Sequence, residues 1–533
     1  MKNRFCAMLD MSRNGVMKVE KVKEYIELIS KMGYNSLMLY TEDTFEVKNE
    51  PLFGYLRGAY TAKEIKEIDA FAIEKGVELI PCIQTLAHLN AIFRWTEYAK
   101  INDTDDILLI GDDRTYQLIE NIFLTLKENF TSRTVLIGLD EAHMVGRGKY
   151  RDINGNEESF NVMLKHLNRV SEIAKKYGFD ALMWSDMFVR IVNNGEYYAE
   201  EPVPESIAQS VPKNVVPVYW DYYHLKEEEY EKYLSLHKCF NEVWFAGGAW
   251  CWCGFVPSLK FAMETMRSAM RVCRKNNIKN IIMTLWGDNG RECSCFTSLP
   301  ILYYAIEVYK GNEDLQKIKD GFRELTGEDF DDFMLLEYPN FCNRGDSLRD
   351  NPSKYMLYND PFFGQFDTNV IGNEKAFYEK AIKVLSKAEK NSNSYKYIFN
   401  FEKELCRVLS LKYQLGAKTR KAYQEEDFVE LRKIVDEYVQ TIKYVKKFLL
   451  SFETLWENEN KPNGFEVQHI RIGGLIQRLI YCKNKILRYL NAKIDSIPEL
   501  EINLIDAHGL ENKSKSGFID FNLWQLNSSV NNI

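Results

Sequence analysis

The chain has 533 residues, of which 45% are hydrophobic, 27% charged and 13% aromatic, and its formal net charge is -8 at pH 7. This composition is typical of a globular protein rich in aromatic side chains, and it excludes a disordered, collagen-like or coiled-coil chain. The length allows one barrel of about 250 residues with a companion domain, or two to four smaller domains. Basic stretches interleaved with aromatic residues are missing, so nucleic acid is not an expected partner.

Two further features bear on compartment and cofactors. No apolar run approaches the roughly 18 residues of a membrane helix, and the N-terminus lacks the long apolar core of a signal peptide. The eleven cysteines are odd in number and scattered, as expected for buried thiols in a reducing compartment, so we expect a cytoplasmic protein without membrane contact. The pairs Cys251/Cys253 and Cys293/Cys295 lack the usual spacing of a zinc knuckle, so neither a metal nor another cofactor is expected.

Residues 1–310 alternate strand-like and helix-like segments. Eight short, nearly continuous apolar runs are typical of strands buried on both faces, and they cover 5–12, 36–42, 77–84, 134–141, 181–187, 215–223, 242–250 and 280–289. Amphipathic stretches such as 19–33 and 61–76 lie between them and close on a glycine. This alternation predicts an α/β fold, a (β/α)8 TIM barrel. A doubly wound sheet is the competitor, but the first turn, DMSRNGV, lacks its G-x-G-x-x-G pattern.

Strand signals fade after residue 310. Apolar residues spaced i, i+3/i+4 predict long helices over 374–391, 395–423, 427–459 and 465–493, typical of a helical bundle. The segment 338–373 between barrel and bundle is rich in Asn, Asp, Gly and Pro and indicates a linker or crossing loop. The expected domains are therefore a barrel over 1–310, linking helices and a crossing loop over 311–373, and an α-helical C-terminal domain over 374–533.

The apolar faces of these long helices need a partner surface. Two arrangements are open: the bundle packs on the barrel alone, or the protein forms a homodimer in which the segment Phe465–Leu475 lies near a barrel mouth. Gly473 and Gly474 lie inside the last long helix, where each costs about 1 kcal/mol relative to alanine. We therefore expect another backbone to approach them closely.

Catalytic groups of a barrel lie where strands end and the following loops begin. The predicted strand ends carry mainly carboxylates and tryptophans, namely Asp10, Arg13, Glu42, Asp43, His88, Asp140, Glu141, Trp184, Asp186, Trp220, Asp221, Tyr222, Trp250, Trp252, Trp286 and Asp288. Indole faces stack on sugar rings, while carboxylates and arginine bind sugar hydroxyls. The sequence therefore predicts a carbohydrate site; the alternative is that the tryptophans only fill the top of the barrel.

The pair Asp140-Glu141 is the sharpest local feature. Adjacent carboxylates repel each other, and at a strand end they are poorly solvated. One of the two then holds its proton near neutral pH, as a general acid must. The alternative is that one carboxylate caps the loop and the other is solvated.

Five motifs in chain order resemble those of glycoside hydrolase family 20, the β-N-acetylhexosaminidases. They are LDMSRN (9–14), LYTEDTF (39–45), CIQTLAH (82–88), IGLDEAH (137–143) and TLWGDN (284–289). The resemblance covers residues 4–310 and looks closest to a bacterial subgroup that begins with the barrel and carries a C-terminal helical domain. It implies an exo-acting, retaining enzyme that removes terminal β-linked N-acetylglucosamine or N-acetylgalactosamine from a glycan.

The resemblance also implies roles for single residues. Glu141 would protonate the glycosidic oxygen and later activate water, and Asp140 would hold the acetamido N–H of the substrate. The acetamido oxygen would then attack the anomeric carbon and form an oxazolinium intermediate, a scheme in which the substrate supplies the nucleophile. The substrate-binding residues implied are Arg13, Glu42 and Asp288 at the sugar hydroxyls, Trp184, Trp220 and Trp286 around the acetamido group and ring, and His88 beside the acid.

Two positions depart from the family pattern. Leu139 stands where the family has a small residue before Asp-Glu, and AGGAWCWCG (246–254) lacks the tyrosine that donates to the acetamido oxygen. Tyr222 and the indole N–H groups of Trp250 and Trp252 are the alternatives for that donor. Three other functions stay open, namely a barrel glycosidase that pairs Glu141 with Asp288 or Glu42, a catalytically silent carbohydrate-binding barrel, and a cysteine-metal or redox protein, which a zinc assay would identify.

Overall fold

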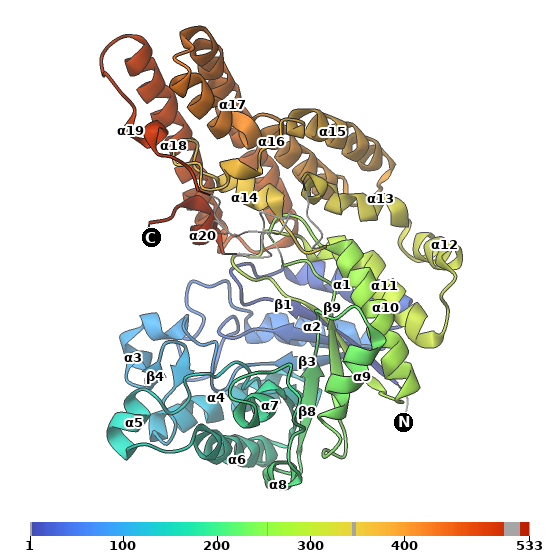
Figure 1. Ribbon diagram of the computed structural model, residues 1–533. Helices are drawn as coiled ribbons and strands as arrows, with labels where there is room; N and C mark the ends of the chain where they lie inside the picture. The colour runs from blue at the N-terminus through green and yellow to red at the C-terminus, as the bar shows by residue number, and fades with distance from the viewer. Residues whose placement is uncertain (1–2, 253, 344–347, 506–522, 532–533) are drawn as a thin grey trace. The chain divides into compact units, whose positions relative to one another are not determined.

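The computed structural model describes residues 3–252, 254–343, 348–505 and 523–531 (Figure 1). Its contacts divide the chain into two compact units. The barrel unit comprises Met1–Ala249, Ala262–Trp286 and Ile301–Ile318, and the helical unit comprises Trp250–Phe261, Gly287–Pro300 and Lys319–Ile533. Each unit is described by itself below.

The barrel unit is built on eight parallel strands that close on themselves in the order β1-β10-β9-β8-β7-β6-β3-β2. The strands are β1 (Arg4–Asp10), β2 (Ser36–Tyr40), β3 (Glu78–Cys82), β6 (Thr134–Leu136), β7 (Asp180–Trp184), β8 (Val215–Trp220), β9 (Trp244–Gly248) and β10 (Asn280–Leu285). Met8 of β1 pairs with Thr284 of β10 on one side and with Met38 of β2 on the other, which closes the barrel. The predicted α/β class and TIM-barrel fold are confirmed.

Helices follow the strands along the chain. They are α1 (Val19–Met32), α2 (Ala62–Glu74), α3 (Thr96–Ala99), α4 (Asp113–Asn129), α5 (Lys149–Asn154), α6 (Ser159–Tyr177), α7 (Asp186–Val192), α8 (Glu205–Ser210), α9 (Glu227–Ser235), α10 (Leu259–Lys275) and α11 (Leu299–Lys310), with the 3-10 turn η1 (Ile92–Arg94). A hairpin of β4 (Asn102–Thr104) and β5 (Ile107–Leu108) stands apart from the barrel sheet. Helix α1 ends as the sequence predicts, because Gly33 adopts φ +103° and its N–H caps the carbonyls of Ile29 and Ser30.

The strands end earlier than their apolar runs. The run 134–141 forms a strand only over Thr134–Leu136, and the run 280–289 only over Asn280–Leu285. Gly138, Leu139 and Glu141 have positive φ values of 78°, 68° and 53°, which the extended backbone of a strand excludes. Their apolar neighbours are buried as loop rather than as sheet, and hydrophobicity alone does not separate these two states.

The helical unit is formed mainly by four long helices, α15 (Glu374–Asn391), α16 (Lys396–Gln424), α17 (Phe428–Glu459) and α18 (Phe465–Leu490). Shorter elements are η2 (Cys295–Ser298), α12 (Leu315–Thr326), α13 (Phe330–Met334), η3 (Leu335–Phe341), α14 (Pro352–Tyr358), η4 (Asp367–Asn369), α19 (Pro498–Glu501) and α20 (Trp524–Ser528). Aromatic packing joins the long helices: the ring of Phe401 stacks on that of Phe448 at 5.1 Å between centroids. The predicted helical C-terminal region is confirmed.

The two segments that follow β9 and β10, Trp250–Phe261 and Gly287–Pro300, belong to the helical unit. Within that unit the buried carboxylate of Glu292 accepts from Lys354 Nζ at 2.8 Å and from Arg471 Nη1 at 3.1 Å. No other backbone of the described part of the chain approaches Gly473 or Gly474, so an approach by a second copy stays a prediction. A Cβ added at either glycine would meet no atom within 4 Å, so these positions face open space.

The described residues also bear on the expectations about membranes, metals and thiols. Among them, no helix combines the length and the apolar character needed to span a bilayer. Over the same ranges, no three His, Cys, Asp or Glu side chains gather in a way that could hold a metal ion. The ten cysteines of the described ranges are free thiols, and among these ten only Cys239 is not buried. Cys253 lies outside the described residues.

Candidate active site

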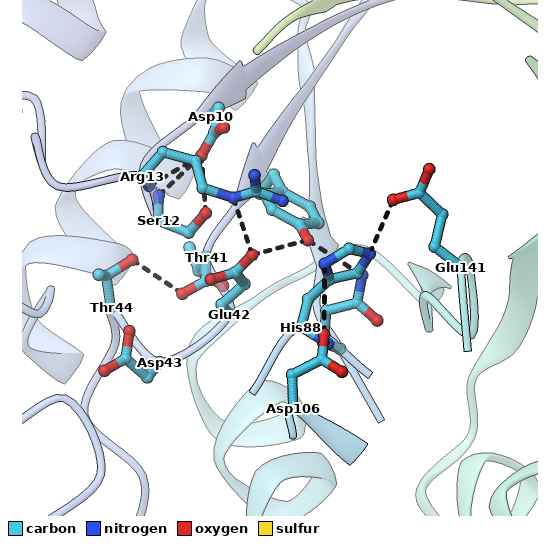
Figure 2. Close-up of polar contacts among 12 residues, drawn as sticks. Asp10, Ser12, Arg13, Thr41, Glu42, Asp43, Thr44, His88, Asp106 and Glu141 are labelled. Carbon is cyan, nitrogen blue, oxygen red and sulfur yellow. Dashed lines mark hydrogen bonds and ion pairs between the residues drawn. The ribbon is translucent and has the colours of Figure 1, made fainter. Parts of the chain in front are cut away.

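Arg13 and Glu42 form the first polar pair at the carboxyl ends of the strands (Figure 2). The Asp10 carboxylate, at the end of β1, accepts from the backbone N–H and the hydroxyl of Ser12, both at 2.8 Å. This turn directs Arg13 towards β2, where its Nε donates to Glu42 Oε1 at 3.1 Å. Tyr40 Oη donates to the same oxygen at 3.0 Å. Burial raises the pKa of Glu42, and the Arg13 guanidinium opposes that rise.

Asp140 lies buried between an amide and an imidazole. Gln84 Nε2 donates to Asp140 Oδ1 at 2.7 Å, and His88 Nε2 forms an ion pair with Asp140 Oδ2 at 3.2 Å. Burial raises the pKa of Asp140, but the protonated His88 and the Gln84 amide outweigh burial, and the pKa falls below its usual range. Burial lowers the pKa of His88, whereas the Asp140 carboxylate raises it to about 10. The two groups therefore hold each other in their charged forms.

Glu141 is the more accessible member of the carboxylate pair, with 45% of its side chain exposed. Its Oε2 lies 3.7 Å from His88 Nε2, and Figure 2 shows the side chain directed towards that imidazole. His88 is held in turn by Asp106, whose Oδ2 accepts the backbone N–H of His88 at 2.8 Å. The pair thus combines a buried, ionised Asp140 with a half-exposed Glu141.

The backbone that carries the pair is unusual. Gly138, Leu139 and Glu141 all have positive φ, and Gln84 lies so close over Gly138 that an added Cβ would come within 1.9 Å of its Oε1. The N–H of Leu139 donates to the same Gln84 oxygen at 3.3 Å. Residues in such sparsely populated backbone regions gather at functional sites.

Four of the predicted aromatic residues share the barrel unit. The Trp184 and Trp286 rings lie 6.1 Å apart between centroids, and Trp286 makes an edge contact with Tyr40 at 4.9 Å. The Trp220 ring stacks on Tyr222 at 5.3 Å. Burial raises the pKa of Tyr222, and hydrogen bonds from the side chains of Trp286 and Thr284 oppose that rise. The structure thus brings Trp184, Trp220, Tyr222 and Trp286 into one connected aromatic group.

Three of the predicted residues, Trp250, Trp252 and Asp288, belong to the helical unit. Trp250 stacks on Trp252 with ring centroids 4.4 Å apart, and Asp288 is half-buried in the segment that follows β10. Their roles at the sugar stay predictions from the sequence.

Three residues that contact the predicted ones are not themselves predicted from the sequence. Gln84 and Tyr40 lie at the ends of β3 and β2, so their position at a strand end was an available signal. Asp106, from the turn between β4 and β5, had no such signal, because a two-stranded hairpin outside the barrel does not show in the barrel's strand pattern.

Comparisons with known proteins agree with these motifs. The family model "Glycosyl hydrolase family 20, catalytic domain" matches residues 5–234, and the model "Glycoside Hydrolase 20C C-terminal domain" matches residues 331–519. Hexosaminidase D from Homo sapiens is 24% identical over 298 residues, which are 50% of this chain and 57% of that protein. Hexosaminidase D from Bos taurus is 25% identical over 290 residues, which are 50% of this chain and 80% of that protein.

A solved β-N-acetylhexosaminidase from Streptomyces coelicolor A3(2) aligns with a TM-score of 0.44 and 17% identity, covering 60% of this chain and 69% of that one. The match to human Hexosaminidase D, described above, spans little more than half of that protein's length. Since one family 20 model covers most of the barrel and a second covers most of the helical unit, the chain belongs to glycoside hydrolase family 20.

Proposed function

We propose that this protein is an exo-acting, retaining β-N-acetylhexosaminidase that removes terminal β-linked N-acetylglucosamine or N-acetylgalactosamine through an oxazolinium intermediate. The observation that carries the proposal is the pairing of an ionised, buried Asp140 with a half-exposed Glu141. Substrate-assisted hydrolysis needs one carboxylate that stays negative beside the acetamide and one carboxyl that donates a proton. The environments of the two adjacent residues differ in this way, because Asp140 is buried beside a cationic imidazole whereas Glu141 is half-exposed.

The chemistry assigns a task to each carboxyl. Glu141 donates its proton to the glycosidic oxygen as the bond to the anomeric carbon breaks, while the substrate's acetamido oxygen bonds to that carbon. Asp140 accepts the acetamido N–H and stabilises the positive charge that develops on the ring nitrogen of the oxazolinium. Glu141 then removes a proton from water, which attacks the anomeric carbon and restores the acetamide with net retention.

The other predicted residues would hold the sugar. Arg13 and Glu42 form a charged pair suited to sugar hydroxyls, and the tryptophans present indole faces to the ring. Among the three alternatives for the acetamido-oxygen donor, we propose Tyr222. Its support is that Tyr222 shares the barrel unit and a hydrogen-bonded contact with Trp286, whereas Trp250 and Trp252 belong to the helical unit.

A panel of 4-nitrophenyl β-glycosides tests the activity. We expect hydrolysis of the GlcNAc and GalNAc derivatives, no comparable hydrolysis of the glucose and galactose derivatives, and competitive inhibition by a thiazoline that mimics the oxazolinium. The first-formed sugar should keep the β configuration, and a chitooligosaccharide should lose single sugars from its non-reducing end.

Other results lead to the alternatives. Equal cleavage of β-glucosides without thiazoline inhibition means a glycosidase with two separated carboxylates, Glu141 with Glu42 or Asp288. Sugar binding without hydrolysis of any glycoside means a silent carbohydrate-binding barrel.

We also propose a cytoplasmic location. The ten free thiols of the described residues support a reducing compartment, because thiols of secreted proteins are usually paired in disulfides. Cell fractionation tests this proposal, and recovery of the native protein from the culture medium would contradict it.

A further inference from the structure

Asp186, the first residue of α7, is a fully buried acid. It lies outside the five family motifs, and the proposed mechanism gives it no role. Its Oδ2 accepts the backbone N–H of Glu141 at 3.0 Å. Arg190, one turn further along α7, donates its Nε to the same oxygen at 3.3 Å. The other oxygen, Oδ1, is buried and has no hydrogen-bond partner among the described residues. One carboxylate oxygen therefore joins the first turn of α7 to the backbone of the candidate general acid.

Glu141 needs such a support. Its φ of +53° lies in the left-handed region, which residues other than glycine rarely adopt. Its side chain is half-exposed, and its ion-pair contact with His88 is long, at 3.7 Å. Side-chain packing does not supply the orientation, so the direction of the carboxyl depends on the backbone conformation at residue 141.

We propose that Asp186 is a positioning residue that locks the backbone of Glu141 in its left-handed conformation and so aims the general acid at the glycosidic oxygen. The proposal rests on the proposed function of Glu141. Arg190 contributes by holding the Asp186 carboxylate in place, since it is anchored itself through Nη1 to the Gly195 carbonyl at 2.9 Å. Burial and the nearby charge of Asp140 raise the pKa of Asp186 to about 7, which is consistent with a carboxyl kept in an acidic cluster for its geometry.

A double-mutant cycle tests this role. Because misplacement of a reacting group by about 1 Å can cost 10²-fold in rate, we expect Asp186→Ala to lower kcat by about 10²-fold, with KM changed less than about threefold. Asp186→Asn keeps an oxygen that can accept the Glu141 N–H, so we expect it to retain more activity than the alanine variant. In a Glu141→Gln background, Asp186→Ala should lower kcat by less than about twofold, since residues that act as one unit are not additive.

The matched control is Asp69→Asn. Asp69 is also a buried barrel-unit aspartate whose carboxylate accepts a backbone N–H, that of Thr131 at 3.3 Å, and its substitution should leave kcat unchanged. Equal losses from Asp186→Ala in the wild-type and Glu141→Gln backgrounds would overturn the proposal. If the alanine variant does not fold, the cycle is run with Asp186→Asn under the same criterion.

A crystal structure of the Asp186 variant gives a readout that does not need activity. We expect Glu141 to leave the left-handed region, and an unchanged φ with an unchanged side-chain direction would refute the positioning role. A wild-type protein that cleaves no 2-acetamido glycoside would refute the proposed function instead, and the structural comparison still decides the role of Asp186.

Discussion

At the level of single residues, the charge of Asp140 decides what its neighbour can do. His88 and Gln84 keep the pKa of Asp140 low in a buried position where desolvation alone would raise it. A fixed negative charge in a site of low dielectric stabilises a developing positive charge strongly, because it needs no reorganisation during the reaction. The charge of Asp140 therefore depends on two residues of the segment that follows β3.

The first prediction concerns the proton donor. Glu141→Gln removes the acidic proton and should lower kcat by roughly 10²–10⁴-fold, the usual contribution of general acid–base catalysis. The loss should be smaller for an aryl glycoside with a good leaving group, which needs less protonation, than for a disaccharide. Steady-state kinetics on both substrates measure this, and wild-type turnover of the disaccharide by the variant would exclude Glu141 as the acid.

The second prediction concerns the acetamide. Asp140→Asn keeps the size of the side chain but removes the charge that stabilises the oxazolinium, so hydrolysis of 2-acetamido substrates should fall by about 10²-fold or more. The thiazoline should also bind more weakly, while the thermal unfolding midpoint stays close to that of the wild type. Unaltered thiazoline affinity in this variant would show that Asp140 does not contact the acetamido group.

The third prediction concerns pH. The pKa of His88 is raised to about 10, so its contribution to stability is complete below about pH 6.5, the ordinary imidazole value, and is lost as the pH rises through about 10. The pKa of Asp140 is lowered, so its contribution is present above about pH 3.9 and is lost as the pH falls through the lower folded-state value. The ion pair is therefore intact across the neutral range.

Removing the His88 cation should shift the acid limb of the pH profile of kcat/KM. In His88→Gln the pKa of Asp140 rises, so kcat/KM should begin to fall at a higher pH than in the wild type as the solution is acidified. The half-exposed His469, which contacts Glu453 in the helical unit, provides a control, because His469→Gln should leave the profile in place. An acid limb at the same pH in His88→Gln and wild type would contradict the assigned interaction.

At the level of elements, the loop after β6 has a specific backbone conformation and packs against the segment that follows β3. Three of its residues have positive φ, and the Gln84 side chain from the end of β3 fills the space above Gly138. A methyl group at residue 138 would therefore displace the amide that holds Asp140. This couples the packing of one glycine to the charge of the site.

A pair of glycine substitutions tests that coupling. Gly138 and Gly76 have similar φ values of +78° and +72°, but a Cβ at Gly76 would meet nothing within 4 Å. Gly76→Ala should lower the free energy of unfolding by about 1–2 kcal/mol for the backbone conformation alone. Gly138→Ala adds an overpacking cost of about 1–3 kcal/mol and should also reduce kcat. Urea denaturation and kinetics measure both effects, and equal losses in the two variants would contradict the role of Gln84.

At the level of the whole molecule, the open face of α18 bears on the oligomeric state. Ile470 of this helix is 70% exposed. A Cβ added at Gly473 or Gly474, also in α18, would meet no atom of the described residues within 4 Å. An exposed apolar side chain next to two glycines, which let another surface approach closely, favours contact with a second copy. We therefore expect a homodimer rather than packing within one chain alone.

Light scattering at low protein concentration tests the dimer. The chain mass is 62.5 kDa, and we expect twice that value for the wild type and the single-chain value for Ile470→Glu. Ile153→Glu, at a residue of α5 that is 69% exposed, is the control and should leave the mass unchanged. A wild-type mass of 62.5 kDa would remove the dimer and leave the bundle as a support within the chain.

The sequence by itself determined the barrel, the four long helices and the residues at the strand ends. These features depend on local periodicity: a buried strand is a short apolar run, and an amphipathic helix repeats every three to four residues. Asp140, Glu141, His88, Arg13 and Glu42 were all identified in this way, because a strand end is a position along the chain.

Only the tertiary structure decided how these residues affect one another. Gln84 and Asp140 are 56 positions apart in the chain, and Glu141 and Asp186 are 45 apart, so their hydrogen bonds exist only once neighbouring strands are paired. The direction of the Asp140 pKa shift, the left-handed backbone at Glu141 and the assignment of the segments after β9 and β10 to the helical unit all follow from such contacts. The physical reason is that periodicity reports which face of an element is buried, whereas charge and orientation depend on which other elements cover that face.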